Sequence, residues 1–486
     1  MELNLQKPDR DRTRDPLGTL DVRQERDWAS LDATAQAACV ARGEISPAEL
    51  VRTARERIEQ LDGVLGAVPV RTFAAAAARA ADMALGSGPL AGVPFLMKDV
   101  GARQAGHPYY AGNRALRDLD HRADRDTPLG ARFRELGLVT LGSSSTPEFG
   151  LQSSTWPLAY GPARNPWDLA RTPGGSSGGA AAAVAAGLVP VAHASDGAGS
   201  IRIPAAWCGL IGLKPTRDRI VWRHAGRGLP EVEFVLARSL RDTIRCLDLL
   251  QLSPPRVPWT PCDRTLRVAF QTRSPAGVPV HPACAAAVES AARTLAGLGH
   301  DVYEAAPDSL FEYEERSLQG AAAAFTQFKH CLEELEIRLG RAVGPGDVEP
   351  FLWELAALGS APPDAAAADR AETWHRAWVG RTLRWFEDFD LLLTPTVAEP
   401  APLLDSLDPR RHAPLALLEK LVLHMEFTEP WNATGQPALS LPLGLADGLP
   451  IGVQLVAAAG SDDLLLELAA PLLDAAPALP RPPIHA

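Results

Sequence analysis

Short apolar runs alternate along this chain with segments of helical spacing, and this alternation limits the fold more than any other feature of the sequence. Strands that alternate with helices imply an α/β sheet, and we predict one that is largely parallel in its centre. A helix start is predicted at Ser46, with Pro47 in the first turn and Glu49 completing a capping box. Strands are predicted at residues 93–97, 137–142, 188–194, 266–270, 391–393, 438–442 and 453–457, and a helix at 462–473.

The chain divides into a charged start and one long folded part. Residues 1–27 are polar and mixed in charge, which predicts a mobile N-terminal arm. Residues from about 250 to 425 are mostly helical in pattern, with strand signals inside them. Because the sequence contains no internal repeat and no low-complexity linker, we predict a single large domain over residues 28–480.

Composition excludes several classes of function. The net charge of the 486 residues is −11, which leaves no basic surplus for nucleic-acid binding. No apolar run reaches the roughly 18 residues of a membrane helix, and the start lacks a secretory signal. The six cysteines are scattered and form no metal-ligand cluster with histidine. We therefore expect a cytoplasmic protein without a metal, a cofactor or a membrane association.

Two glycine-rich loops carry the strongest chemical signals. The first places Ser176 and Ser177 between glycines, in the sequence Gly-Gly-Ser-Ser-Gly-Gly of residues 174–179. The second, Ser-Asp-Gly-Ala-Gly-Ser at 195–200, has the pattern of a strand end, a tight turn and a helix start. Such a turn directs successive backbone N–H groups into one space, where they bind a developing oxyanion. Ser200 is therefore a candidate nucleophile.

A serine nucleophile needs a base, and the sequence offers no ordinary one. It contains neither a GxSxG elbow nor a histidine motif, and His193 alone is more typical of a packed side chain. Lys98 ends an apolar strand, so burial can lower its pKa from about 10.4 and provide a neutral amine. A nucleotide site is not indicated, because no GxxxxGK[ST] motif is present.

Several ordered motifs resemble those of the amidase-signature family, from about residue 28 to 475. They are residues 91–99 (AGVPFLMKD), 146–150 (TPEFG), 164–168 (RNPWD), the double-serine loop, 199–204 (GSIRIP), 208–209 (CG), 212–216 (GLKPT), 393–396 (LTPT) and 435–438 (GQPA). The resemblance implies a single α/β/α domain whose central mixed β-sheet is covered by helices. It also implies that a variable helical region, roughly 300–430, specifies the substrate.

The resemblance assigns roles by position. It makes Lys98 the base, Ser176 a bridging serine on a cis peptide and Ser200 the nucleophile. It implies an oxyanion hole formed by the backbone N–H groups of Gly197, Ala198, Gly199 and Ser200. Relatives usually carry Thr-Gly-Gly-Ser where this chain has Gly197, Ala198, Gly199 and Ser200, so Ala198 adds a methyl group at this turn.

Further roles follow from the same resemblance. Ser153 is expected to hydrogen-bond the triad and Ser177 to brace the loop, while Asp196 and Arg202 are expected to form a buried ion pair. Candidates for lining the substrate pocket are Tyr109, Tyr110, Trp156, Phe325, Phe328 and Trp431.

The resemblance implies hydrolysis of a carboxylic amide through an acyl-enzyme, extending to carbamates or aryl esters. Within this family the sequence features most resemble those of bacterial amidases such as the 6-aminohexanoate cyclic-dimer hydrolases. We expect a small-molecule amide as substrate and a monomer or homodimer. One alternative is the glutamine-hydrolysing subunit of a tRNA-dependent amidotransferase, which Trp156 and Pro157 disfavour because they replace a Glu-Asn pair. Another is a catalytically silent binding scaffold.

Overall fold

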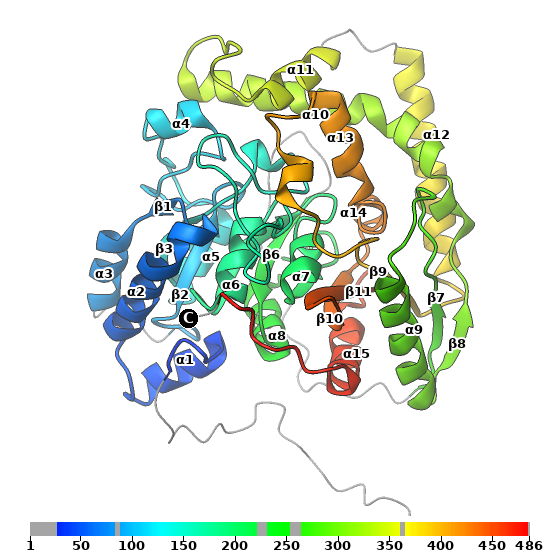
Figure 1. Ribbon diagram of the computed structural model, residues 1–486, viewed down its shortest axis with the longest axis horizontal. Coiled ribbons are helices and arrows are strands. Elements are labelled where there is room, and N and C mark those ends of the chain that lie inside the picture. The colour runs from blue at the N-terminus through cyan, green and yellow to red at the C-terminus, as the bar shows by residue number, and fades with distance from the viewer. Residues whose placement is uncertain (1–26, 83–87, 221–230, 253–263, 360–364, 485–486) are drawn as a thin grey trace, which may run out of the picture.

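The structure, a computed structural model, describes residues 27–82, 88–220, 231–252, 264–359 and 365–484 (Figure 1). All of the predicted mobile arm except Asp27 lies outside these residues. Within them the chain forms one sheet of eleven strands in the order β1-β3-β2-β4-β6-β5-β10-β11-β9-β7-β8. The strands are β1 (Val70–Arg71), β2 (Pro94–Lys98), β3 (Val139–Ser144), β4 (Val191–Asp196), β5 (Ile211–Lys214), β6 (Val232–Ala237), β7 (Arg267–Phe270), β8 (Asp301–Glu304), β9 (Leu391–Pro395), β10 (Ala438–Ala446) and β11 (Leu449–Ala457).

The α/β class and the mixed sheet are as expected, but the expectation of a parallel centre is wrong. Parallel pairs occur toward the two ends of the sheet, where β2 pairs with β3 and β4, and β7 with β8 and β9. The central pairs, from β4 through β6, β5, β10 and β11 to β9, are all antiparallel.

A short hairpin is one reason for the antiparallel centre. Two residues, Asp447 and Gly448, join β10 to β11, and their φ angles are 51° and 80°. Both values are positive, as a type I′ turn requires, and this turn closes two antiparallel strands directly. An Asp-Gly pair between apolar runs is the signal in the sequence that predicts this hairpin.

Helices cover the sheet, and a further group of helices lies above the ends of its strands. The start predicted at Ser46 is confirmed, because its side chain and that of Glu49 form a reciprocal capping box. Figure 1 shows α10, α11 and α13 together in the upper part of the molecule, above the ends of the strands. The helices are α1 (Ala33–Ala41), α2 (Pro47–Leu65), α3 (Phe73–Ala81), α4 (Arg114–Asp118), α5 (Pro128–Glu135), α6 (Gly178–Ala185), α7 (Arg202–Cys208), α8 (Leu240–Leu250), α9 (Pro282–Gly297), α10 (Tyr313–Leu339), α11 (Pro350–Leu358), α12 (Ala365–Trp385), α13 (Pro414–Leu423), α14 (Glu429–Thr434) and α15 (Asp462–Ala475).

Alternation along β11 separates a polar face from the main core. Val453 and Leu455 belong to the large apolar cluster of the sheet. Gly452 and Gln454 face the other way, toward α7: a Cβ on Gly452 would lie 2.4 Å from Ala206, and Gln454 bonds Arg202. Because strand side chains alternate between faces, this side of the sheet can hold buried polar groups beside α7.

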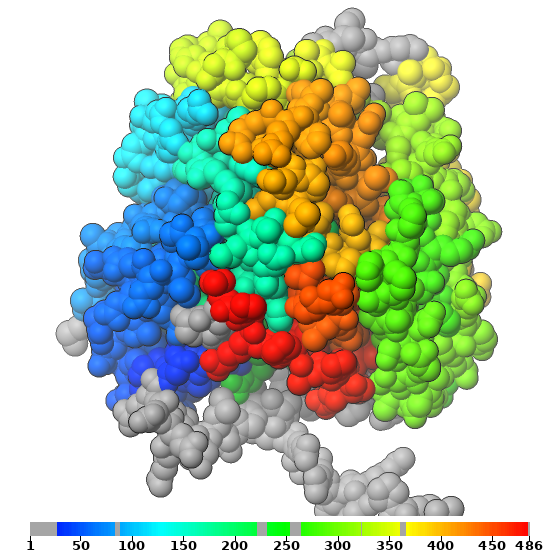
Figure 2. Space-filling model, in the orientation of Figure 1, coloured from blue at the N-terminus to red at the C-terminus, as the bar shows by residue number. Residues whose placement is uncertain are grey.

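The C-terminal residues return across the molecule after α15 (Figures 1 and 2). Ile484 donates its N–H to the Pro166 carbonyl at 3.2 Å, and Arg481 lies 3.9 Å from Asp27. In the described residues no helix is both long enough and apolar enough to cross a membrane.

Candidate active site

Lys98 is the last residue of β2, and its side chain is buried. Its Nζ donates to Ser176 Oγ at 2.7 Å and to Ser195 Oγ at 2.9 Å. Burial lowers the pKa of Lys98 to about 8, although the carboxylates of Glu231, Glu233 and Asp196 act in the opposite direction. The neutral amine is therefore far more populated near neutral pH than that of an exposed lysine.

The loop that presents Ser176 leads into α6 and is enclosed by backbone. The Gly175–Ser176 peptide bond is cis, as expected from the resemblance. A Cβ on Gly175 would lie 2.7 Å from both the Gln152 carbonyl and the Ser154 N–H nitrogen. Glycine is required where two backbone segments approach this closely. The position of Ser176 is therefore fixed by the 152–154 segment as well as by its own loop.

Ser200 lies in the turn between β4 and α7, and it is half-buried. The expectation of four oxyanion donors needs one correction, because the Gly199 N–H donates to Asp196 Oδ1 at 2.7 Å. The N–H groups of Gly197, Ala198 and Ser200 donate to none of the groups in the described residues. Three backbone donors therefore remain at this turn.

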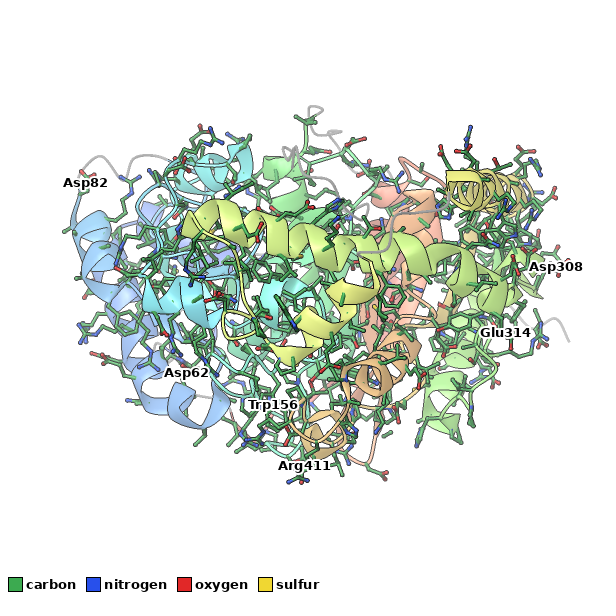
Figure 3. The ribbon with its side chains drawn as sticks, turned by 90° about the horizontal axis from the view of Figure 1, so that it is seen from above. Asp62, Asp82, Trp156, Asp308, Glu314 and Arg411 are labelled. Atoms are coloured by element: carbon green, nitrogen blue, oxygen red, sulfur yellow. The ribbon has the colours of Figure 1, made fainter. Side chains whose placement is uncertain are left out.

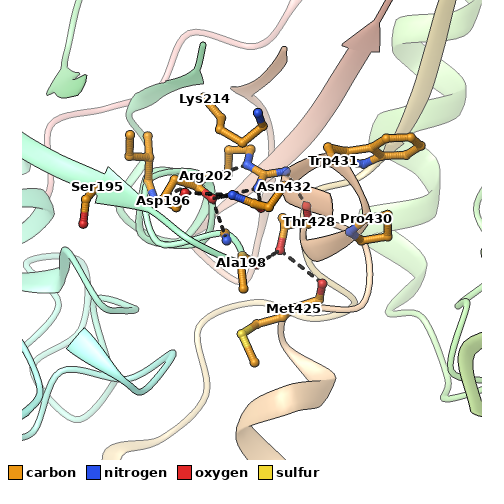
Figure 4. A network of polar contacts seen from close by, with 12 residues as sticks. Ser195, Asp196, Ala198, Arg202, Lys214, Met425, Thr428, Pro430, Trp431 and Asn432 are labelled. Carbon is orange, nitrogen blue, oxygen red and sulfur yellow. Dashed lines mark hydrogen bonds and ion pairs between the residues drawn. The ribbon is translucent and has the colours of Figure 1, made fainter. Parts of the chain in front are cut away.

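A buried polar network behind the turn holds it in place (Figure 4). Arg202 and Asp196 form the expected ion pair, with Nη2 and Oδ1 2.8 Å apart and both side chains fully buried. Burial alone would raise the pKa of Asp196, but the Arg202 charge and its hydrogen bonds hold that pKa at about 2. Asn432 adds bonds to the Asp196 carbonyl at 2.7 Å and to Oδ1 at 3.0 Å.

Of the two serines expected to support the triad, Ser177 has the expected contacts and Ser153 does not. Ser177 Oγ donates to the Ser195 carbonyl at 3.2 Å and accepts from its N–H at 3.3 Å, so it ties the loop to β4. Ser153 differs from the expectation of a bond to the triad. Its hydroxyl donates to the Leu421 carbonyl at 2.9 Å and lies 3.0 Å from His424 Nδ1.

The six candidate pocket residues do not form one group. Tyr109, Tyr110 and Phe328 lie in one apolar cluster, with Phe325 packed against it. Trp431 lies in a different cluster, with its ring edge-on to Phe386. Trp156 lies under the guanidinium of Arg410, 5.1 Å from the ring centre, in the same part of the molecule as Arg411 (Figure 3). Trp156 also lines a cavity of about 540 Å³ together with Arg114 and Arg410.

Sequence reasoning missed three residues that hold this site: Ser195, Thr428 and Asn432. Ser195 precedes the ion-pair aspartate and bonds the Lys98 ammonium. Thr428 donates to the Ala198 carbonyl at 2.6 Å. Among the described residues no cluster of three histidine, cysteine or acidic side chains is placed to hold a metal ion.

Comparisons with known proteins agree with this architecture. A family model described as Amidase matches residues 49–466. The 6-aminohexanoate-cyclic-dimer hydrolase of Pseudomonas sp. (strain NK87) is 39% identical over 93% of this chain and 96% of its own length. A solved 6-aminohexanoate cyclic dimer hydrolase complexed with substrate superposes with a TM-score of 0.86 at 36% identity, covering 94% of this chain and 100% of that one. A bacterial aryl acylamidase of the amidase-signature family gives 0.81 at 26% identity, covering 92% and 96%.

Proposed function

The chain belongs to the amidase family, and on that premise we propose that this amide hydrolase acts through a Lys98–Ser176–Ser200 relay and an acyl-enzyme. The observation that carries the proposal is the 2.7 Å contact between Lys98 Nζ and Ser176 Oγ at a fully buried lysine. Its support is the half-buried Ser200 in a turn where three backbone N–H groups donate to none of the groups that the structure describes.

The proposed proton path begins at the neutral Lys98 amine. It takes the proton of Ser176 Oγ, which takes that of Ser200 Oγ as this oxygen bonds to the substrate carbonyl carbon. The N–H groups of Gly197, Ala198 and Ser200 then hold the oxyanion, since such donors act strongly where water is excluded. When the tetrahedral intermediate collapses, the same relay returns a proton to the leaving amine, and water releases the acyl group in the second half-reaction.

His193 is a poor alternative base, although it lies in β4 beside Lys98. Its Nδ1 accepts the Lys98 backbone N–H at 3.1 Å, and its Nε2 faces Glu233 Oε2 at 3.4 Å. Burial and the neighbouring Lys98 charge lower the pKa of His193 to about 3. Neither ring nitrogen is directed at a serine, so this geometry supports the lysine relay.

We propose aliphatic secondary amides, cyclic or linear, as the substrate class. The relatives named for 6-aminohexanoate cyclic dimer support this choice through their similarity over nearly the whole chain. Beside Ser176, a Cβ on Gly150 would lie 3.4 Å from both Ser176 Oγ and Val100 Cγ1, so a valine methyl lies near this hydroxyl. An alkyl chain next to the substrate carbonyl would suit this apolar neighbour.

The test measures hydrolysis of 6-aminohexanoate cyclic dimer and of an aliphatic anilide, together with labelling by a phosphonofluoridate. We expect Ser200→Ala to abolish both turnover and labelling, and Ser176→Ala to lower turnover by several orders of magnitude. Ser290→Ala, on the exposed face of α9, is the matched control and should retain both. Substantial turnover by Ser200→Ala would reject that serine as nucleophile. Ammonia release from glutamine instead of amide hydrolysis would favour the amidotransferase alternative.

A further inference from the structure

Thr428 occupies a helix N-cap position, but its side chain bonds a different part of the chain and does not cap the helix. It is the N-cap residue of α14, and its hydroxyl makes no capping bond to that helix. N-cap threonines are favoured because their side-chain oxygen accepts an N–H from the first turn. Here the hydroxyl instead donates to the Ala198 carbonyl at 2.6 Å, with a longer contact to the Met425 carbonyl at 3.2 Å (Figure 4).

The Ala198–Gly199 peptide unit is therefore held at both ends. Thr428 holds its C=O, and Asp196 Oδ1 holds its N–H at 2.7 Å. In a trans peptide these two groups point in opposite directions, so the two bonds together fix the rotation of the peptide plane. The neighbouring N–H groups of Ala198 and Ser200 take their directions from this plane.

Gly199 makes such a restraint necessary. Its φ is 132°, and glycine alone crosses this part of conformational space at little cost. If the Ala198 carbonyl were released, the peptide could rotate and direct its oxygen into the space that the N–H groups serve. Contact with Thr428 also closes the space beside the glycine, since a Cβ there would lie 2.2 Å from Thr428 Oγ1.

The backbone of Thr428 is fixed by the same network. Its carbonyl accepts Arg202 Nη1 at 2.8 Å, and the same Nη1 donates to Gln454 Oε1 at 2.8 Å. Arg202 in turn is paired with Asp196. The residue is therefore a rigid point from which its hydroxyl can position the turn.

We propose that Thr428 is a positioning residue for the oxyanion turn, acting through the Ala198 carbonyl; this inference rests on the function proposed above. Its hydroxyl keeps the three remaining N–H groups directed at the oxyanion. It contributes to transition-state stabilisation and little to ground-state binding of the amide.

The experiment compares Thr428→Val, which keeps the shape and removes the donor, with Thr428→Ser, which keeps the hydroxyl. Thr434→Val is the matched control, because it removes a hydroxyl from α14 that, within the described part of the chain, bonds only the Pro430 carbonyl. Each variant is assayed for kcat and KM on an anilide, for inhibition by a trifluoromethyl ketone that forms a tetrahedral adduct, and for Tm. Removing one oxyanion donor outright costs about 10²–10³-fold in kcat, and a misdirected turn should cost on the order of tenfold or more.

We expect Thr428→Val to lose on the order of tenfold in kcat with KM within about twofold, and to lose ketone affinity in parallel. Thr428→Ser should recover most of both, and Thr434→Val should keep both even if its Tm falls. Equal kinetic losses in Thr428→Val and Thr434→Val, or a loss confined to Tm or KM, would overturn the inference. Turnover by Ser200→Ala would reject the proposed function itself, whereas an inactive Ser200→Ala beside a normal Thr428→Val would reject this inference alone.

Discussion

The pH dependence of amide hydrolysis is the prediction that follows most directly from the site. If the neutral amine of Lys98 starts the reaction, kcat/KM follows its neutral fraction. With a pKa of about 8, that fraction is roughly 1% at pH 6, 9% at pH 7 and 90% at pH 9. We therefore expect kcat/KM to rise about 90-fold between pH 6 and pH 9 and then to level off. An unshifted lysine would give a rise of about 1000-fold over the same range with no plateau.

Variants identify the group behind this rise. Lys98→Arg should be inactive throughout, because a guanidinium keeps its proton at these pH values. Lys214 is a second buried lysine, and burial and the Arg202 charge lower its pKa to about 7, so it could produce a similar rise. Its amine donates to the Pro215 carbonyl and to no serine of the described residues, so Lys214→Met should leave the position of the rise unchanged. Lys420→Ala, on the exposed side of α13, is the control with a wild-type profile.

Steady-state hydrolysis of an anilide from about pH 5.5 to pH 10 is the assay, with Tm measured at each pH to separate unfolding from titration. An activated ester serves as a second substrate, since its leaving group needs no returned proton and should be less affected by Lys98→Ala. Near-wild-type amidase activity in Lys98→Arg would refute the relay. If the rise of kcat/KM with pH shifted in Lys214→Met and persisted in Lys98→Ala, the titrating group would be Lys214 and not Lys98.

Three further predictions concern the turn and the buried acids. Gly199→Ala should lose activity and stability, because its Cβ would lie 2.2 Å from Thr428 Oγ1, whereas Gly197→Ala, with contacts no closer than 4.0 Å, should keep its Tm. Asp196→Asn should lower the free energy of unfolding, measured in urea, by about 3–5 kcal/mol, because it leaves a buried guanidinium without its counter-charge. In the native protein the aspartate pKa is about 2. The ion pair therefore stabilises the fold fully above about pH 4, and this stabilisation is lost as pH falls toward 2. Burial raises the pKa of Glu349 from 4.5 to about 7, so between these pH values the folded state holds a proton that the unfolded state has released, and stability falls as pH rises. Glu349→Gln should therefore reduce the loss of Tm between about pH 4.5 and pH 7, and an unchanged slope would contradict this.

Local signals in the sequence located the strand end and the two loops of the site, whereas the family resemblance selected Lys98, Ser176 and Ser200 among their residues. An apolar run ending in Lys98 predicts a strand that ends there, and β2 does end at this residue. Glycines around Ser176 and before Ser200 predict tight loops because few other residues adopt such backbone angles. These features depend on near neighbours in the chain, so they can be read without the fold.

The hydrogen-bond acceptor of the Gly199 N–H can also be predicted from residues close to it in the sequence. An aspartate three residues before an amide is a common acceptor for it, as in N-caps and Asx turns. Asp196 and Gly199 have this spacing, and their bond is present. The family resemblance implied four oxyanion donors, whereas the aspartate at the start of the turn already indicates that the Gly199 N–H is engaged.

Strand direction and the supports of the turn could not be predicted in this way. The antiparallel centre depends on which strands become neighbours, and β5 lies between β6 and β10 although more than 200 residues separate Lys214 from Ala438, its partner in β10. Thr428 contacts Ala198 across 230 residues, and Asn432 contacts Asp196 across 236. No spacing rule relates residues this far apart.

One short segment, residues 424–432, connects the helical end of the molecule to the oxyanion turn. Thr428 and Asn432 hold the turn from this segment. Glu429, next to Thr428, accepts from Arg316 Nε at 3.1 Å, and Arg316 belongs to α10. The segment therefore contacts α10 on one side and the turn on the other, which makes Arg316 a residue of the helical region joined by bonded contacts to the residues that hold the turn.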